Sequence, residues 1–174
     1  MKPIRLDGRS LTRAQLVAVA HGAQVELAEE QLPAVARAAE FLAEQVRREE
    51  PIYGVSTGFG SNADRLLGAH RLRAELHGEP QPSGTLHEEL QRNLIVTHAV
   101  CVGEPFAPDV VRAMLCIRIN TLLRGHSGIR VATLQALAAM LNAGVVPVVP
   151  QLGSVGASGD LAPLSHLAIV LLGS

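Results

Sequence analysis

Residues 153–168 read GSVGASGDLAPLSHLA, a glycine-rich turn followed by an apolar stretch with helical spacing. The three glycines permit positive φ angles and a close approach of the backbone to neighbouring groups. Asp160 is placed to cap a helix that begins at Leu161, with a proline in its first turn. Glycine-rich turns before helices are common. The spacing alone therefore leaves two interpretations open, a structural turn or a loop that carries chemistry.

Two glycine-rich segments partly resemble nucleotide-binding motifs, but each lacks a feature that its motif requires. A phosphate-binding loop needs a lysine directly after its glycines, and Lys2 is the only lysine in the chain. Residues 58–63, GFGSNA, loosely match the dinucleotide fingerprint, which must follow a strand and open a helix. The preceding residues 53–57 make a poor strand, so the sequence disfavours nucleotide binding.

Composition places the chain among ordinary globular proteins. It has 174 residues, a formal net charge of −1 and 48% hydrophobic residues, enough for one domain with a real core. The near-neutral charge excludes a basic protein that coats nucleic acid. One tyrosine and three phenylalanines are too few for base-stacking platforms or for an aromatic membrane belt.

The cysteines and the first residues favour a cytoplasmic protein. The opening MKPIRLDGRS lacks the apolar region of a signal peptide, and no run reaches the roughly 18 apolar residues of a membrane span. Cys101 and Cys116 lie in apolar, helical stretches, where a free cysteine usually behaves as a small buried hydrophobe. We therefore expect reduced thiols and neither a membrane nor a nucleic acid as partner.

Outward from the turn, apolar spacing predicts a mainly α protein. Ser10 is a plausible N-cap for a first helix that ends at Ala20, before Gly22. Further helices are predicted over 27–48, 65–76, 86–102, 108–122 and 129–142, the last three as an antiparallel α-rich bundle. The predicted connections are a Gly-rich loop at 51–64, a surface insert at 77–84 and an extended segment at 145–150.

Four segments together resemble one enzyme family. The string at 153–168 is nearly letter for letter similar to the cofactor segment of the histidine and aromatic amino acid ammonia-lyases. Three more segments resemble that family in the same order: YGVSTGFG (53–60), QRNLIVTHAVCVGEPF (91–106) and RGHSGIR (124–130). The resemblance implies the N-terminal part of the ammonia-lyase, or fumarase/aspartase-like, fold: a helical bundle with Gly-rich loops whose residues 1–174 form the cofactor-bearing domain.

The resemblance implies a cofactor built from the chain itself. In the family an Ala-Ser-Gly tripeptide cyclises and loses two waters, so 4-methylidene-imidazol-5-one would form autocatalytically from Ala157, Ser158 and Gly159. A side chain at 159 would crowd the attack of that nitrogen on the Ala157 carbonyl, and the Ser158 hydroxyl must leave. The following helix would point its N-terminal amides at the ring, where negative charge develops.

Tyr53 is the base that the resemblance assigns to the removal of a proton from the substrate β-carbon. Phenols hold their proton at neutral pH, so the site must activate or position this one. The loop at 51–64 fits a lid that closes over the substrate and excludes water. Without the other segments, an exposed tyrosine in a flexible loop would be the simpler interpretation.

Thr97 and His98 are implied to line the pocket for the substrate side chain, and Gly60 and Leu161 are also assigned to substrate binding. At this position histidine-specific members carry Ser-His and phenylalanine-specific members typically carry Phe-Leu. The pair Thr97-His98 resembles the histidine type most, which favours L-histidine as the first substrate and tyrosine as the second. A buried polar group left unpaired costs about 1–3 kcal/mol, which disfavours a phenyl ring. The alternative for His98 is a core histidine satisfied by a backbone carbonyl.

The chain also departs from the family pattern. It stops just after the cofactor helix begins, so we expect a truncated chain that lacks the downstream substrate-binding residues. Family active sites combine three subunits of a tetramer, so a homotetramer and the missing C-terminal part are the expected partners, and the isolated piece is expected to be inactive. The insert at 77–84 lengthens the lid region.

The expected activity is a carbon-nitrogen lyase reaction, the elimination of ammonia from L-histidine to give urocanate. Competing interpretations are a tyrosine or phenylalanine ammonia-lyase, a 2,3-aminomutase of the same family, and a non-catalytic helical assembly fragment. His126 and His166 match family positions without an evident role and are interpreted as structural. No spacing of His, Cys, Asp and Glu resembles a metal site.

Overall fold

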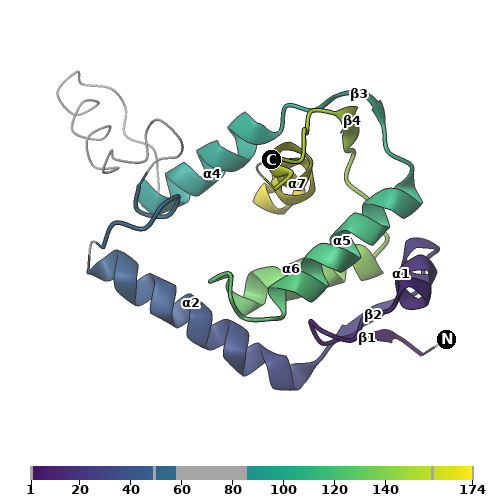
Figure 1. The fold of residues 1–174 in the computed structure, drawn as a ribbon, viewed down its shortest axis with the longest axis horizontal. Coiled ribbons are helices and arrows are strands. Elements are labelled where there is room, and N and C mark those ends of the chain that lie inside the picture. The colour runs from purple at the N-terminus through teal and green to yellow at the C-terminus, as the bar shows by residue number, and fades with distance from the viewer. Residues whose placement is uncertain (1, 49, 58–85, 158, 174) are drawn as a thin grey trace.

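The computed structural model describes residues 2–48, 50–57, 86–157 and 159–173. Figure 1 shows a mainly helical chain with α5 and α6 near its centre and the long α2 along one side, which confirms the predicted class. Across these ranges the helices are α1 (Arg13–Ala20), α2 (Leu32–Arg47), α4 (Leu86–His98), α5 (Pro108–Leu122), α6 (Val131–Asn142) and α7 (Leu161–Ile169). The strands are β1 (Ile4–Leu6), β2 (Val25–Leu27), β3 (Val102–Pro105) and β4 (Pro150–Leu152), and 3-10 turns cover Glu29–Gln31 and Val170–Leu172.

The hydrophobic core lies where α5 packs against both α1 and α6. Leu115 and Ile119 of α5 and Leu134 and Leu141 of α6 are fully buried. Each such side chain contributes about 1.5–3 kcal/mol relative to the same side chain in water. The predicted packing of α5 against α6 is confirmed. The third helix of the predicted bundle, α4, packs chiefly on α7 instead.

Both cysteines are free and buried, as the sequence predicts. Cys116 lies on α5 inside the core, and Cys101 follows α4. Burial raises the pKa of the Cys116 thiol to about 11, against the opposing effect of the positive charge on Arg112. The Cys116 thiol therefore stays neutral and serves as an apolar core group.

A short parallel sheet near the N-terminus was missed by the sequence analysis. Strands β1 and β2 pair with Ile4 opposite Val25, and α1 forms the connection between them. Three-residue strands are too short to show an alternating pattern. The Asn142 side chain accepts a hydrogen bond from the Val25 N–H at 2.8 Å and donates one to its carbonyl at 2.9 Å. The helix predicted from residue 27 accordingly begins only at Leu32.

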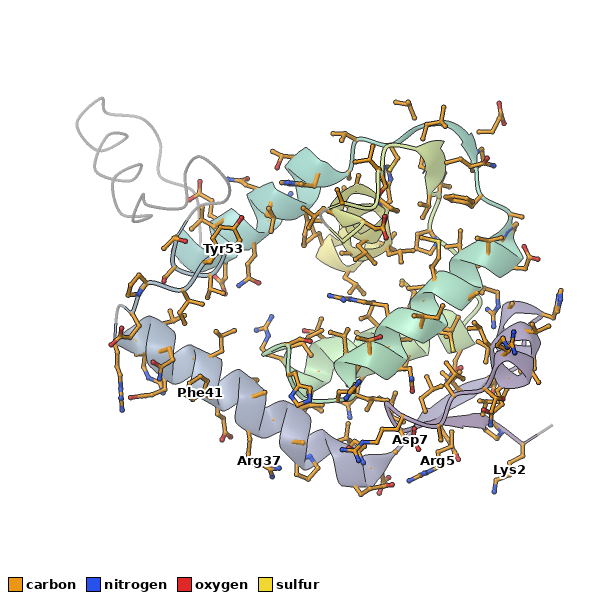
Figure 2. All side chains as sticks on the ribbon, in the orientation of Figure 1. Lys2, Arg5, Asp7, Arg37, Phe41 and Tyr53 are labelled. Carbon is orange, nitrogen blue, oxygen red and sulfur yellow. The ribbon has the colours of Figure 1, made fainter. Side chains whose placement is uncertain are left out.

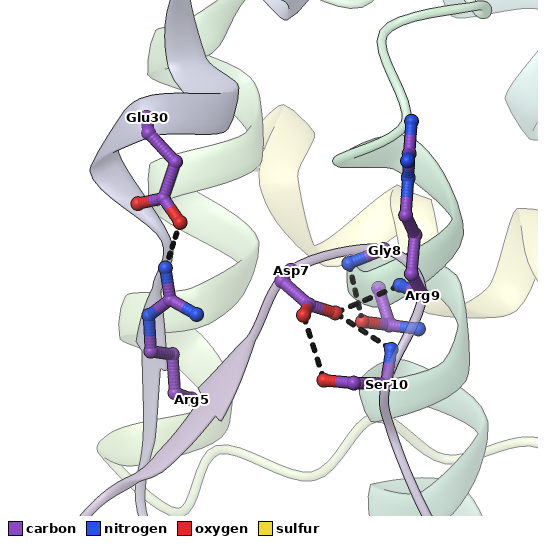
Figure 3. A network of polar contacts seen from close by, with 7 residues as sticks. Arg5, Asp7, Gly8, Arg9, Ser10 and Glu30 are labelled. Carbon is purple, nitrogen blue, oxygen red and sulfur yellow. Dashed lines mark hydrogen bonds and ion pairs between the residues drawn. The ribbon is translucent and has the colours of Figure 1, made fainter.

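Asp7 organises the turn after β1 (Figure 3). One carboxylate oxygen accepts the N–H groups of Arg9 and Ser10, both at 2.8 Å, and the other accepts the Ser10 hydroxyl at 2.7 Å. These bonds, led by the Ser10 hydroxyl, lower the pKa of Asp7 to about 2. The prediction that Ser10 caps α1 was wrong because its hydroxyl binds Asp7. Thr12 is the N-cap, in a reciprocal capping box with Gln15.

Arg112 of α5 joins three segments through its guanidinium group. Its Nε donates to the Val19 carbonyl at 2.9 Å, one terminal nitrogen donates to the Leu141 carbonyl at 3.0 Å, and the other donates to the Ala23 carbonyl at 3.3 Å. Val19 and Leu141 lie in the last turns of α1 and α6, where the helix dipole concentrates negative charge. One cation thus ties the ends of two helices to α5.

The RGHSGIR motif forms the connection between α5 and α6 and packs against α2. Gly125 has φ +69°, and an ideal Cβ there would lie 2.8 Å from the Ala34 carbonyl carbon. Gly128 has φ +67°, and its Cβ would lie 2.6 Å from a Leu42 methyl group. Glycine at both positions therefore sets how closely this connection approaches α2.

Several predicted boundaries shift. Helix α4 ends at His98 rather than at residue 102, because the chain becomes extended and forms β3. Helix α6 begins at Val131 rather than at residue 129. The extended connector is confirmed for 145–149, although Pro150 already belongs to β4. The predicted helix at 65–76 and the insert at 77–84 lie outside the described residues. No helix within the described ranges is long and apolar enough to cross a membrane.

We expect Arg112→Met to lower the free energy of unfolding by about 3 kcal/mol, because a charged hydrogen-bond donor to three carbonyls is lost while the aliphatic stem is kept. For a chain of this size that is a fall of roughly 6–12 °C in the midpoint of thermal unfolding, followed by circular dichroism. Arg118→Met, an exposed arginine on the same helix, is the matched control and should shift the midpoint by less than about 2 °C. Equal shifts in the two variants would contradict this role of Arg112.

Candidate functional site

The loop at 153–160 follows a two-stranded antiparallel sheet. Strands β3 and β4 pair with Val102 opposite Leu152 and Pro105 opposite Pro150. The Gln151 side-chain amide adds a hydrogen bond to the Pro105 carbonyl at 3.1 Å. The sheet therefore fixes the point at which the loop begins, next to the chain that leaves α4.

Gly153, the first residue of this loop, lies directly against Cys101. An ideal Cβ on Gly153 would be 2.9 Å from the Cys101 Cα and 2.7 Å from its Sγ, and Gly153 has φ +155°. A Cβ cannot approach a backbone atom this closely, so either the loop or the chain at Cys101 would have to move. The glycine is required here for close packing between two segments.

A side-chain hydrogen bond closes the loop across its ends. The Ser154 hydroxyl donates to a carboxylate oxygen of Asp160 and accepts the Gly156 N–H at 3.2 Å. Asp160 has φ 59°, the one positive φ among the described non-glycine residues. Its side chain makes no capping hydrogen bond to α7. The predicted N-cap position of Asp160 and the helix start at Leu161 are confirmed, but the carboxylate binds Ser154 and does not cap the helix amides.

The tripeptide segment lies at the exposed tip of the loop. Ala157 and Gly159 are exposed, and Ser158 lies outside the described residues. Gly159 has φ +87°, and no heavy atom lies within 4 Å of an ideal Cβ built on it. Helix α7 begins directly afterwards at Leu161, which is 41% exposed. The loop thus presents its backbone to a space that the described residues leave open.

Thr97 and His98 are the last residues of α4. The Thr97 hydroxyl donates to the Asn93 carbonyl at 2.7 Å. The half-buried His98 ring has its Nδ1 2.9 Å from the Leu94 carbonyl. A carbonyl only accepts, so Nδ1 carries a proton, and in the neutral ring Nε2 is the hydrogen-bond acceptor. The core-histidine interpretation therefore holds for Nδ1, whereas Nε2 can accept a hydrogen bond from a partner.

Tyr53 lies in a compact turn between α2 and α4, with its side chain 64% exposed. The N–H groups of residues 55–57 all point to the Ile52 carbonyl, at 3.0–3.3 Å. Tyr53 is drawn on the left of Figure 2, whereas α7 lies near the centre of Figure 1 in the same orientation. Gly60 and the remainder of the predicted lid at 51–64, beyond Thr57, fall outside the described residues.

A cavity of about 470 Å³ opens between α5, the loop and the first turn of α7. The exposed face of α5 contributes Arg118 and Thr121, and the loop contributes Ser154, Gly159 and Asp160. No sequence motif marks Arg118 and Thr121, because exposed polar side chains on a helix form none. Their spacing of three, which puts them on one helix face, is the signal that could have found them.

The described part of this chain brings only some of the predicted site residues together. Tyr53, Thr97 and His98 are not among the residues that line the cavity beside the loop. Thr97 and His98 are neighbours, with 3.3 Å between the Thr97 hydroxyl and His98 Nδ1. Within the described ranges, no three His, Cys, Asp or Glu side chains gather into a group that could hold a metal ion.

Comparison with known proteins decides the family. The model of the aromatic amino acid lyase family matches residues 11–174. The chain belongs to this family. A histidine ammonia-lyase of Symbiobacterium thermophilum is 49% identical to this chain over 167 residues, 95% of the chain, and one of Gloeobacter violaceus is 48% identical over 97% of it. The chain spans about 30% of the length of each of these curated relatives.

Solved structures of the family share the fold. The histidine ammonia-lyase of Trypanosoma cruzi matches 99% of this chain with a TM-score of 0.79 and 40% identity. The tyrosine aminomutase of Streptomyces globisporus matches 99% of it with a TM-score of 0.83 and 35% identity. In both cases this chain covers 30% of the solved chain. The predicted ammonia-lyase fold is therefore confirmed.

We expect Gly153→Ala to destabilise the chain by at least about 2 kcal/mol, because the new methyl group meets the Cys101 backbone and the φ angle is unfavourable for alanine. Gly156→Ala is the matched control. It has φ +73° but nothing within 4 Å of its Cβ, so it carries only the cost of backbone strain, about 1–2 kcal/mol. Urea unfolding measures both variants. A larger loss at 156 than at 153 would show that the contact with Cys101 is unimportant.

Proposed function

We propose that residues 1–174 form the N-terminal, cofactor-bearing domain of a histidine ammonia-lyase, which eliminates ammonia from L-histidine to give urocanate. The observation that carries this proposal is the 48–49% identity to two histidine ammonia-lyases over nearly the whole chain. In this proposal, residues 51–64 are the lid, residues 77–84 are an insert and residues 153–160 are the cofactor loop.

The proposed cofactor is 4-methylidene-imidazol-5-one, made from Ala157, Ser158 and Gly159. The Gly159 nitrogen would bond to the Ala157 carbonyl carbon, whose oxygen leaves as water with the N–H hydrogens of Gly159 and Ser158 as a C=N bond forms to the Ser158 nitrogen. Ser158 would then lose its hydroxyl with its α-hydrogen as a second water. The φ of +87° at Gly159 suits glycine, which supports the fit of this segment to the reaction. The hydrogen bond between Ser154 and Asp160 brings the two sides of the tripeptide toward each other. The finished ring supplies an electrophile for the substrate amine.

Tyr53 is the proposed base. As the phenolate, its oxygen takes the β-proton, the electron pair of the Cβ–H bond forms the Cα–Cβ double bond, and the pair of the Cα–N bond leaves with the amine nitrogen. The exposure of its ring supports a role in meeting a substrate rather than in filling a core. The turn that carries it is tied to the Ile52 carbonyl, which gives the phenol a defined backbone support.

Thr97 and His98, with Gly60 and Leu161, are the proposed substrate-binding residues. The hydrogen bond from His98 Nδ1 to the Leu94 carbonyl leaves Nε2 as an acceptor for an N–H of the substrate imidazole. The Thr97 hydroxyl donates its hydrogen bond to the Asn93 carbonyl, so toward a ligand it can act only as a hydrogen-bond acceptor. Both groups therefore favour a side chain with a hydrogen-bond donor over a phenyl ring.

A tyrosine aminomutase is the second candidate. The structural match to the Streptomyces globisporus tyrosine aminomutase supports it, and the His98 acceptor would suit a phenol O–H as well as an imidazole N–H. An aminomutase returns the ammonia to the β-carbon. Urocanate as the product therefore supports the first candidate, and a β-amino acid supports the second.

The proposed complete enzyme is a cytoplasmic homotetramer that includes a C-terminal part beyond this chain. The relatives are more than three times as long as the chain, which supports this. Val102, Leu152 and Val155, on and after the β3–β4 sheet, are 64%, 63% and 94% exposed. Apolar side chains in such positions favour cover by further protein. We expect the 174-residue piece by itself to be inactive.

The first test combines intact mass with product analysis of the complete polypeptide. The wild type should be about 36 Da lighter than its sequence mass, with the deficit in the peptide that contains Ala157–Gly159, and should convert L-histidine to urocanate. Ser158→Ala should restore the full mass and lower kcat by at least about 10³-fold, because it has no hydroxyl to lose. An active wild type of unmodified mass would contradict the proposed cofactor, and a wild type with the deficit but no urocanate would contradict the proposed substrate.

The second test concerns substrate choice. His98→Leu should lower kcat/KM for L-histidine by about 5- to 150-fold, equivalent to the loss of a buried hydrogen bond worth roughly 1–3 kcal/mol. Its kcat/KM for L-phenylalanine should stay the same or rise. His98→Gln, which retains an acceptor, should lose less L-histidine activity than His98→Leu. Equal losses in the two variants would show that the acceptor does not select the substrate.

A further inference from the structure

We propose that His166 is a positioning residue that holds the substrate-recognition end of α4 against the cofactor loop, acting through the backbone of Cys101. Neither its own charge nor contact with substrate is needed for this role. The inference rests on the proposed function, because the spacing of these two segments matters only if they serve one reaction.

The direct observation is a hydrogen bond between α7 and the chain that follows α4. The Cys101 N–H donates to His166 Nε2 at 3.1 Å, although the two residues are 65 positions apart in the chain. Helices α4 and α7 pack against each other, and Cys101 follows the end of α4. A ring nitrogen that accepts must be unprotonated, so the neutral ring carries its proton on Nδ1.

Cys101 is held from both flanks of the cofactor loop. Ahead of the loop, β4 pairs with β3 so that Leu152 lies opposite Val102, and Gly153 packs on the Cys101 backbone. Beyond the loop, His166 reaches back from α7 to the Cys101 N–H. The contact of Gly153 with Cys101 fixes where the loop leaves the sheet. The hydrogen bond from Cys101 to His166 fixes where α7 lies, so both ends of the loop are held on Cys101.

Cys101 is also close in sequence to the substrate-recognition residues. It comes three positions after His98, the last residue of α4. The chain between them has a backbone hydrogen bond from the Val100 N–H to the His98 carbonyl at 2.9 Å. A shift of Cys101 therefore moves the end of α4, and with it His98, relative to the tripeptide. A misplacement of about 1 Å that arises away from the reacting atoms can cost 10²-fold in rate.

The proposed role of His166 needs only a side-chain hydrogen-bond acceptor that reaches the Cys101 N–H, not an imidazole. Substitutions that remove or keep such an acceptor therefore test it. His166→Leu keeps apolar bulk and removes the acceptor, which leaves the buried Cys101 N–H unpaired. His166→Gln keeps a side-chain oxygen that can accept from the same N–H. His21→Leu, at the exposed C-cap of α1, is the matched control for the histidine-to-leucine change itself.

The experiment uses the complete polypeptide and four readouts: intact mass, thermal midpoint, hydrogen exchange of the Cys101 amide, and kcat and KM for L-histidine. In His166→Leu we expect the 36 Da deficit to be kept, because residues 157–159 are untouched, and the Cys101 amide to exchange at least about tenfold faster. We expect kcat/KM to fall about 10- to 100-fold. His166→Gln should restore both the exchange rate and kcat/KM to within about threefold of the wild type.

Wild-type kcat/KM in His166→Leu overturns the inference, as does a His166→Gln variant that protects the Cys101 amide yet remains as impaired as His166→Leu. If His166→Leu does not fold, His166→Gln decides: wild-type exchange and kinetics support the inference, and impaired kinetics with a wild-type thermal midpoint overturn it. Failure of the proposed function is a different result, namely a wild type without the mass deficit and without product.

Discussion

The arrangement of the described chain depends on the guanidinium group of Arg112. It meets the carbonyls at the ends of α1 and α6 and the carbonyl of Ala23 just before β2, all from a position on α5. Helix ends that converge in a protein interior bring partial negative charges together, and one planar cation with several donors satisfies them at once. Because α1, β2 and α6 share this partner, none of the three can shift alone.

Close contacts at three glycines fix the connections between the core helices and the loop at 153–160. Glycines at 125 and 128 let the α5–α6 connection lie against α2, and Gly153 lets the loop at 153–160 start on Cys101. In each case a methyl group would occupy space that a neighbouring atom already fills. The RGHSGIR segment and the glycines of the loop are therefore packing devices, whatever chemistry they also serve.

The sequence predicted the fold class and the family because the decisive residues are chemically specific: a serine flanked by small residues in a turn, followed by an apolar helix. It failed at two side-chain caps because a competing partner lies nearby in the chain. Ser10 looks like a helix cap, but its hydroxyl binds Asp7, three residues earlier. Asp160 occupies the N-cap position of α7, but its carboxylate binds Ser154, six residues earlier. Strands β1 and β2 are too short to show an alternating pattern, and the Asn142 side chain that binds Val25 lies 117 positions away, outside any local window of sequence.

The two asparagine contacts with the N-terminal segment bear on the order of folding during synthesis. Asn120 binds the Gly8 N–H over 112 positions, and Asn142 binds Val25 over 117. A ribosome adding about 5–20 residues per second makes Asn142 roughly 6–23 s after Val25. Throughout that interval β1, α1 and β2 have no α6 to dock on. The N-terminal segment must wait for its partner, so its apolar residues Leu6 and Val19, fully buried in the finished fold, are open to chaperones while the chain grows.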